Sequence, residues 1–290
     1  MKKLFAILFI LLLLAAGAFL VINYIQKGAL LSKIKDMIEP APQEVPQQSF
    51  SDQLFTGDIG AGSGADPAVE PFIVAARSNN TQQLESLDNA SVDTRDTSGM
   101  TALMYASRGR SIEALRLLLT KGASTNLQDN AGYTALMHGT VSSFDEGVDA
   151  LLQSGADPNL MARNGQTALD IAVERGRTSL VNLMVTRGAD VNTATIGGVT
   201  PLMHAASNGS AANIRTLAIS GANPNARDVD GYTAVIYAAE RGQLDAVKEL
   251  IAYGANFTLR DNNGATALGH AQANNHIAVA EFLQSIGAPE

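Results

Sequence analysis

The chain has 290 residues, a formal net charge of −8 at pH 7 and no cysteine. The lack of cysteine excludes disulfides and lipid anchors attached through a thiol. The acidic balance argues against a protein that binds the phosphate backbone of a nucleic acid.

The N-terminal segment, residues 1–27, contains a long apolar run. Leu4–Ile22 comprises nineteen residues without a charged or strongly polar side chain, and it follows Lys2 and Lys3. As a helix this run would be ~28 Å long, close to the ~30 Å hydrocarbon core of a bilayer. We therefore expect a signal anchor, that is, one N-terminal transmembrane helix.

A cleaved secretory signal is the alternative interpretation of this segment. The residues Ala16-Gly17-Ala18 fit a small-x-small cleavage site, and cleavage near Ala18 would release the rest of the chain. The apolar run continues past that site, which favours the anchor. Lysines flank both sides of the run, so they do not settle the topology, but the short basic N-terminus is typical of a bacterial signal. We expect a single-pass protein of the inner (cell) membrane with its bulk facing the periplasm.

Residues 28–70 are expected to be a connecting segment. Residues 28–39 could form a short juxtamembrane helix, whereas residues 40–70 are rich in Pro, Gly, Gln and Ser and have too few apolar side chains to fold alone. The glycine-rich stretch 60–64 has no strand before it, so it is interpreted as part of a flexible linker and not as a phosphate-binding loop.

The remainder of the chain is built from a repeated phrase. Six threonines stand 33 residues apart, and each opens a related sequence such as TALMYA or TPLMHA. A glycine precedes each threonine by two positions, and a Gly-Ala pair follows it by 21 positions. Self-similarity at a fixed period of this length indicates a repeat array. The six threonines are Thr101, Thr134, Thr167, Thr200, Thr233 and Thr266.

One unit of the array is expected to contain two short helices. Thr101 is placed to cap the first helix through its hydroxyl. A break near Gly109 and Arg110 ends that helix, and the second helix carries Leu115 and Leu118 on one face. Helices of this length are not stable alone in water, so we expect them to stack on the helices of neighbouring units.

This pattern resembles the ankyrin repeat in its period, its Thr-Pro/Ala-Leu opening, its helix pair and its Gly-Ala stop. The resemblance covers residues 71–290, as a degenerate N-terminal cap at 71–95 and six repeats at 96–290. It implies an all-α fold, a solenoid of stacked helix-turn-helix units from which β-turn fingers project. A terminal unit with a polar outer face, as at Asn79–Gln83, is expected of such an array.

The sequence departs from the family pattern at two places in the repeat. The family's loop aspartate is present in four units but is replaced by Ala162 and Thr195, so the third and fourth fingers should be less well braced. The histidine that the family often has at the fourth position of the opening is absent, and that position holds Asp170 in the third repeat. Histidine stands one place later instead, at His138, His204 and His270.

These three histidines do not suggest a metal site. They occur in alternate repeats, and equivalent positions two repeats apart are separated by ~16–20 Å, whereas zinc ligands lie ~2 Å from the metal. Tyr105 and Tyr237 occupy the same slot, which indicates packing positions with a polar tip. Metalloprotease, nucleophile-elbow and phosphate-loop motifs are also missing, so we predict no catalytic activity and no cofactor.

The resemblance implies a surface for binding another protein. The variable surface positions of the family are the residue before each threonine and the residues seven and eight after it. Exposed tyrosine and arginine are the usual energetic anchors of an interface. The alternative is that Tyr133 and Tyr232 only cover the bases of the fingers. The candidate partner-binding residues are Met100, Arg108, Tyr133, Glu174, Arg175, Val199, Tyr232, Glu240 and Arg241.

These observations predict a membrane-tethered, monomeric array that binds a partner protein through its finger tips and concave face. It resembles bacterial ankyrin proteins of the periplasm, some of which support a partner enzyme. An immunity or inhibitor protein that blocks a toxin or enzyme is the alternative within the binding class. An enzyme built on the array would need a perturbed acid–base cluster, and the sequence offers none.

Overall fold

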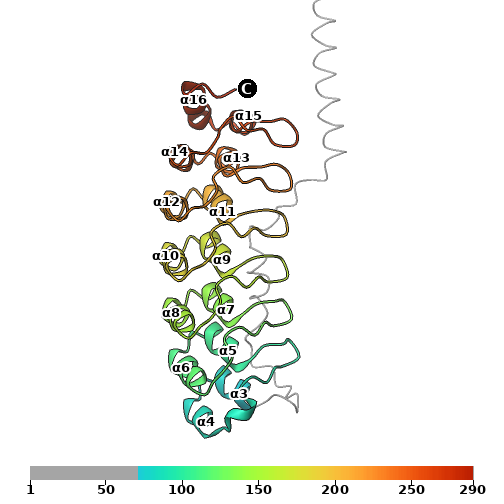
Figure 1. Cartoon of the computed structure of the whole chain (residues 1–290), viewed down its shortest axis with the longest axis vertical. Coiled ribbons are helices and arrows are strands. Elements are labelled where there is room, and N and C mark those ends of the chain that lie inside the picture. Colours follow the sequence, from blue (N-terminus) through green and yellow to red (C-terminus); the bar gives the residue numbers. More distant parts are fainter. Residues whose placement is uncertain (1–70, 290) are drawn as a thin grey trace, which may run out of the picture. The chain divides into compact units, whose positions relative to one another are not determined.

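The computed structural model describes residues 71–289, which form a stack of helix pairs (Figure 1). The first helices of neighbouring pairs pack on one another and form one row, and the second helices form another. Between residues 71 and 289 no helix is long and apolar enough to cross a membrane. The predicted span Leu4–Ile22 and the linker lie outside the described residues.

The pairs follow the predicted repeat boundaries. A short 3-10 helix, η1 (Asn89–Ser91), lies between the first two pairs. The pairs are α3 (Pro71–Arg77) with α4 (Thr81–Ser86), α5 (Ala102–Arg108) with α6 (Ile112–Thr120), α7 (Ala135–Val141) with α8 (Asp145–Gln153), α9 (Ala168–Glu174) with α10 (Thr178–Thr186), α11 (Pro201–Ser207) with α12 (Ala211–Ile219), α13 (Ala234–Glu240) with α14 (Leu244–Ala252), and α15 (Ala267–Ala273) with α16 (Ile277–Ser285).

A threonine directly precedes each first helix from α5 onward, as predicted, and its hydroxyl caps five of these six helices. Thr101 accepts a hydrogen bond from the amide of Met104 at 3.4 Å, and Thr266 accepts from that of Gly269 at 3.1 Å. Thr233 is the exception, because its buried hydroxyl has no hydrogen-bond partner in residues 71–289 and its φ is −108°. The expectation of a cap was therefore wrong at this one position.

The turn between the two helices of each pair needs a residue with positive φ. The sequence placed this break near Gly109 and Arg110, and the structure assigns the left-handed conformation to Arg110, with a φ of 57°. Gly176 holds the equivalent position with a φ of 64°. Glycine adopts this conformation without strain, whereas a side chain with a Cβ does not.

The core lies between the two rows of helices and continues from one repeat to the next. Leu115 and Leu118 are fully buried, as the three-residue spacing predicted, and so are Val181 and Met184 two repeats later. At the ends of the array, Asn79 and Gln82 are exposed on the first pair, and Gln284 is exposed on the last. The terminal units therefore have the polar outer faces that were expected of them.

A two-residue turn projects from the array before each capping threonine, and we call the residues around it a finger. Each finger is closed by a backbone hydrogen bond such as Asp96 N to Met100 O, at 3.0 Å. Consecutive fingers are joined as well, since Asn130 N donates to Ser98 O at 3.0 Å. The same bond recurs at Arg163, Ile196, Val229 and Asn262, so the fingers form one continuous edge on the side of the first helices (Figure 1). Fingers 1 to 6 are residues 95–100, 128–133, 161–166, 194–199, 227–232 and 260–265.

Candidate protein-binding surface

The base of the second finger is built around Asp129, whose side chain is 8 % exposed. Oδ1 of Asp129 accepts hydrogen bonds from the amides of Ala131 and Tyr133, both at 2.8 Å. Oδ2 accepts a hydrogen bond from Nε2 of His138 on α7, at 2.9 Å. Burial alone would raise the pKa of Asp129, but the hydrogen bonds from His138 and the two amides outweigh it and lower the pKa below its usual value. The aspartate is thus an ionised brace.

In three other fingers the aspartate makes the same contact, with a tyrosine in two of them and a histidine in the third. The hydroxyl of Tyr105 donates to Oδ2 of Asp96 at 2.7 Å, and burial together with this contact raises the pKa of Tyr105 to about 12. Fingers 5 and 6 contain the equivalent pairs Tyr237–Asp228 and His270–Asp261, at 2.6 and 2.9 Å. The prediction that these ring residues pack with a polar tip is confirmed, and the tip contacts the finger aspartate.

The third and fourth fingers have weaker braces, as predicted. Ala162 has no carboxylate to offer, and Thr195 supplies one hydroxyl contact, to the amide of Val199 at 3.2 Å. His204 consequently has no finger aspartate to contact, and burial lowers its pKa, although the nearby Asp170 acts in the opposite direction. Burial raises the pKa of Asp170, which lies on α9 beside α11. Oδ1 of Asp170 and Nε2 of His204 both lack a hydrogen-bond partner in residues 71–289.

Two predicted binding residues lie in the interior. Met100 is 5 % exposed and Tyr133 is 2 % exposed, so the expectation that they lie on the surface was wrong. The residue before each threonine closes its finger through a backbone hydrogen bond, and the ring of Tyr232 also lies 4.9 Å from that of His270 in the next repeat. The ring of Tyr133 lies 5.6 Å from that of His138, and the ring of Tyr232 lies 5.4 Å from that of Tyr237. The alternative, that both tyrosines cover finger bases, describes the structure correctly.

The other predicted residues are at least partly exposed. Val199 and Tyr232 are half-buried in the fingers, with little of their surface free for a partner. Arg108, Glu174 and Glu240 end the first helices α5, α9 and α13, and Arg175 and Arg241 follow directly. The structure thus brings the charged candidates to the same end of their helices, and Glu174 and Arg175 lie close enough to the buried Tyr133 to shift its pKa in opposite directions.

The most exposed apolar residues of the fingers were missed by the sequence reasoning. Ile196 is 74 % exposed and Val229 is 65 % exposed, and they occupy the same position of neighbouring fingers. The signal was present in the sequence, because the equivalent residue is polar in every other finger. These polar residues are Thr97, Asn130, Arg163 and Asn262.

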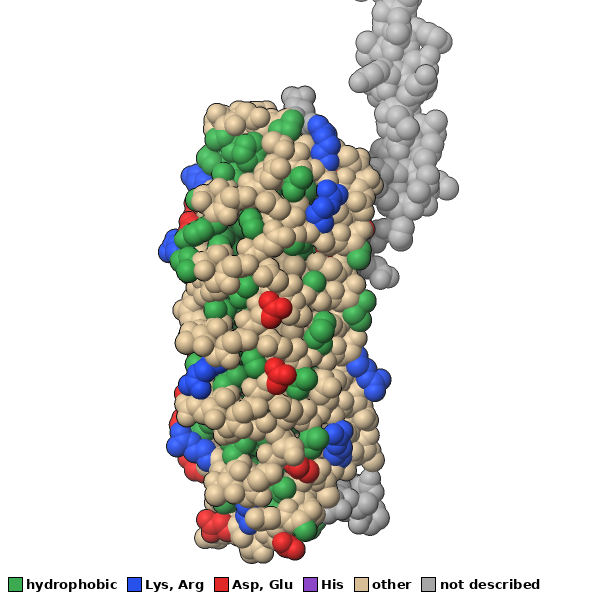
Figure 2. Space-filling model, viewed as in Figure 1, with side chains coloured by type: hydrophobic (Ala, Val, Ile, Leu, Met, Phe, Trp, Pro, Cys, Tyr) green, Lys and Arg blue, Asp and Glu red, His purple; other side chains and the backbone are tan. Residues whose placement is uncertain are grey.

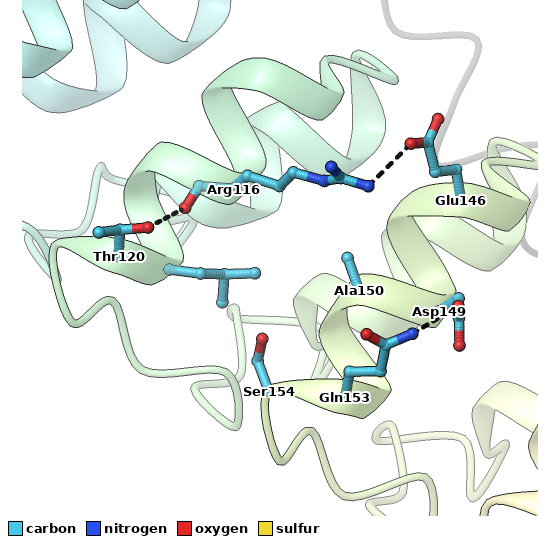
Figure 3. A pocket seen from close by; sticks show the side chains of 8 residues that line it. Arg116, Thr120, Glu146, Asp149, Ala150, Gln153 and Ser154 are labelled. Carbon is cyan, nitrogen blue, oxygen red and sulfur yellow. Dashed lines mark hydrogen bonds and ion pairs between the residues drawn. The ribbon is translucent and has the colours of Figure 1, made fainter.

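The opposite face, formed by the second helices, is lined with ion pairs between repeats. Arg116 on α6 contacts Glu146 on α8 at 2.9 Å, above an open hollow of ≈ 550 Å³ (Figure 3). Asp149 in the same hollow accepts from Gln153 at 2.7 Å and from Arg187 of the following repeat at 2.7 Å. Its polar groups are therefore engaged with one another, and they form no acid–base cluster. Residues 71–289 contain no group of three side chains suited to hold a metal.

A stack of paired helices with fingers along one edge defines the class of repeat solenoids. A family model described as "Ankyrin repeats (3 copies)" matches residues 72–162, 142–228 and 202–289, so the chain belongs to the ankyrin repeat family. The crystal structure of the ankyrin repeat domain of Bcl-3, described as a unique member of the IkappaB protein family, is similar. It shares 30 % sequence identity with a TM-score of 0.67, over 75 % of this chain and 99 % of that one. The comparison with curated proteins gave no match.

Proposed function

We propose that the protein is a membrane-tethered scaffold without catalytic activity that binds a partner protein along its fingers and the adjoining ends of its first helices. One observation carries this proposal. The fingers are joined by hydrogen bonds into a continuous frame, while the outward side chains at the tip differ from one repeat to the next. A regular frame that presents variable side chains is suited to recognition of an extended surface.

The charge distribution supports the same face. On the opposite face, arginines in or next to the second helices form ion pairs with acidic residues of neighbouring repeats, as in Arg177–Asp145 and Arg215–Glu249, both at 2.8 Å. Beside the fingers, Glu240 and Arg241 end α13 with opposite charges, and Glu174 and Arg175 do so at α9. Paired charges at the rim of an interface favour specificity for a partner with a complementary pattern.

Site-specific photo-crosslinking tests the binding face. A photoreactive residue placed at Arg241 should link the full-length protein to a discrete partner in intact cells. The same residue at Ile219, which is 71 % exposed on α12 of the opposite face, should give no such product. Equal crosslinking from both positions, or none from Arg241, would contradict the proposal. The identity of the product separates a supported enzyme from a blocked toxin.

The tether is part of the proposal and needs its own measurement. The apolar run Leu4–Ile22 supports it, because a run of this length suits a bilayer core. An anchored protein stays in the membrane pellet after an alkaline carbonate wash, and its intact mass includes residues 1–18. Release into the wash together with loss of those residues would replace the anchor with a cleaved signal.

A further inference from the structure

In fingers 2 and 6 the tip residue is an asparagine, and its side chain links the finger to the preceding one. The side-chain amide of Asn130 donates to the backbone oxygen of Thr97 in the preceding finger, at 2.9 Å. Asn262 makes the same contact to Val229, also at 2.9 Å. These bonds add to the backbone bonds between the same fingers, so asparagine is a residue that stabilises the edge at this position.

Fingers 4 and 5 lack this stabilising side-chain contact. Ile196 and Val229 occupy the tip position there, and their side chains can make no hydrogen bond to the preceding finger. The two fingers are neighbours, because Val229 N donates to Gly197 O at 3.1 Å. Met161 of finger 3 is also 43 % exposed. Single exposed apolar side chains are ordinary, but neighbouring ones on projecting turns indicate a contact surface.

Arginines border this apolar pair on both sides. Arg163 occupies the tip of finger 3 and Arg227 begins finger 5, and both are exposed. Neither takes part in an ion pair with any residue in 71–289, and Nη2 of Arg227 only reaches the neutral Oδ1 of Asn262 at 3.4 Å. Asp230 is the exposed acidic residue of these three fingers. Figure 2 shows hydrophobic side chains midway along the finger edge, with basic side chains above and below them.

We propose that Ile196 and Val229 form a docking site for a partner segment that carries an apolar residue flanked by aspartate or glutamate. The apolar side chain would cover the two aliphatic residues and exclude water, and the acidic flanks would lie against Arg163 and Arg227. Among their exposed charged side chains these fingers have two arginines and one aspartate, whereas the whole chain has a net charge of −8, so an acidic partner is the complementary one. This inference rests on the proposed function and specifies the chemistry of its partner.

Selection from a random-peptide phage library tests the proposal, with the purified full chain in detergent as the target. We expect enriched peptides to contain an apolar residue with Asp or Glu close by. A synthetic peptide of the enriched sequence should bind the double variant Ile196→Asn/Val229→Asn at least about tenfold more weakly than the wild type. Asparagine occupies this tip position in two other fingers of the chain, so the variant should keep the fold.

Matched variants separate the two parts of the site. Arg163→Asn/Arg227→Gln introduces the residues found at the same positions of finger 2, Asn130 and Gln128, and should weaken binding most at low salt. The control Ile219→Asn makes the same chemical change on the opposite face and should leave the affinity unchanged.

Enrichment of peptides without acidic residues, enrichment of none, or equal binding by the tip variant would overturn the assignment. The assignment would also be overturned if the wild type bound phosphatidylglycerol vesicles and the tip variant did not. The ligand of these fingers would then be a membrane surface and not a peptide. Peptides that bind normally to the tip variant but fail to bind an Arg241→Glu chain would overturn this site while leaving the proposed function intact.

Discussion

The imidazole Nε2 of His138 lies 2.9 Å from Oδ2 of Asp129, at the base of the second finger. The finger immediately before it makes the same contact with a phenol, from Tyr105 to Asp96 at 2.7 Å. Two chemically different rings therefore perform one structural task. What the position requires is a planar ring with a hydrogen-bond donor at its far end.

His138→Tyr should therefore be tolerated, whereas His138→Phe should destabilise the array. Phenylalanine keeps the ring but leaves a buried carboxylate oxygen without its partner, at a cost of about 1–3 kcal/mol. Urea denaturation at pH 7 followed by circular dichroism measures both variants. Equal losses of unfolding free energy in the two variants would show that the ring's donor has no role.

Arg110→Gly should stabilise the protein. Arg110 adopts a φ of 57°, which costs a residue with a Cβ about 1 kcal/mol, and Arg110 lies on the surface. Relief of this strain should raise the melting temperature by about 2–4 °C in a domain of this size. The reverse change, Gly176→Ala, should lower it by a similar amount. A Cβ at position 176 would meet no atom within 4 Å, so the loss of stability would come from the positive φ alone and not from a steric clash.

Asn213→Ala should also stabilise the array. Asn213 is fully buried on α12, and neither its side-chain nitrogen nor its oxygen has a hydrogen-bond partner in residues 71–289. An unsatisfied buried amide costs about 1–3 kcal/mol, and alanine fills the same position at Ala114 and Ala246. Thermal unfolding should show a higher melting temperature for the variant. An unchanged or lower value would mean that a bound water or a cavity cost offsets the gain.

Asp170→Met should change how stability depends on pH. Burial raises the folded-state pKa of Asp170 above 3.8, so the wild type loses stability as pH rises from about that value through the raised pKa. The variant lacks this group, and methionine occupies the equivalent position at Met104, Met137 and Met203. The stability of the variant relative to wild type should therefore increase between pH 4 and pH 7.

The half-buried His204 also makes the stability of the variant relative to wild type increase with pH. Burial lowers its pKa below 6.5, so it destabilises the fold as pH falls toward the folded-state pKa, and the charge of Asp170 reduces this effect in the wild type. Removing Asp170 should make the variant more sensitive to low pH. Urea melts at four pH values measure the difference, and a difference independent of pH would contradict the assignment.

The sequence was sufficient to predict the helix pairs because their signals are local. Thr101 and its five counterparts place the starts of the first helices, and the apolar spacing of Leu115 and Leu118 defines the buried face of a second helix. Both depend on residues within one or two helical turns. The sequence also predicts the loss of the finger aspartate at Ala162 and Thr195, because the six repeats can be aligned with one another and these two lack it.

Exposure within the fingers was not predictable in the same way. The sequence pattern predicts Met100 and Tyr133 as surface residues, but the structure buries both, whereas Ile196 and Val229 project into solvent. Each of the first five fingers contacts the next finger on one side, as in the bond from Asn130 N to Ser98 O. Which residues this contact covers depends on how two units stack, and not on the order of residues within one unit.

The sequence by itself determined the repeat, its helices, five of the six threonine caps and the polar ends of the array, since all of these follow from the chemistry of residues close together in one unit. Only the tertiary structure decided which variable residues face solvent, because contacts between fingers join residues about 33 positions apart. It also decided that Asp170 lies near His204, and that Oδ1 of Asp170 and Nε2 of His204 have no hydrogen-bond partner in residues 71–289. That outcome depends on the packing of α9 against α11.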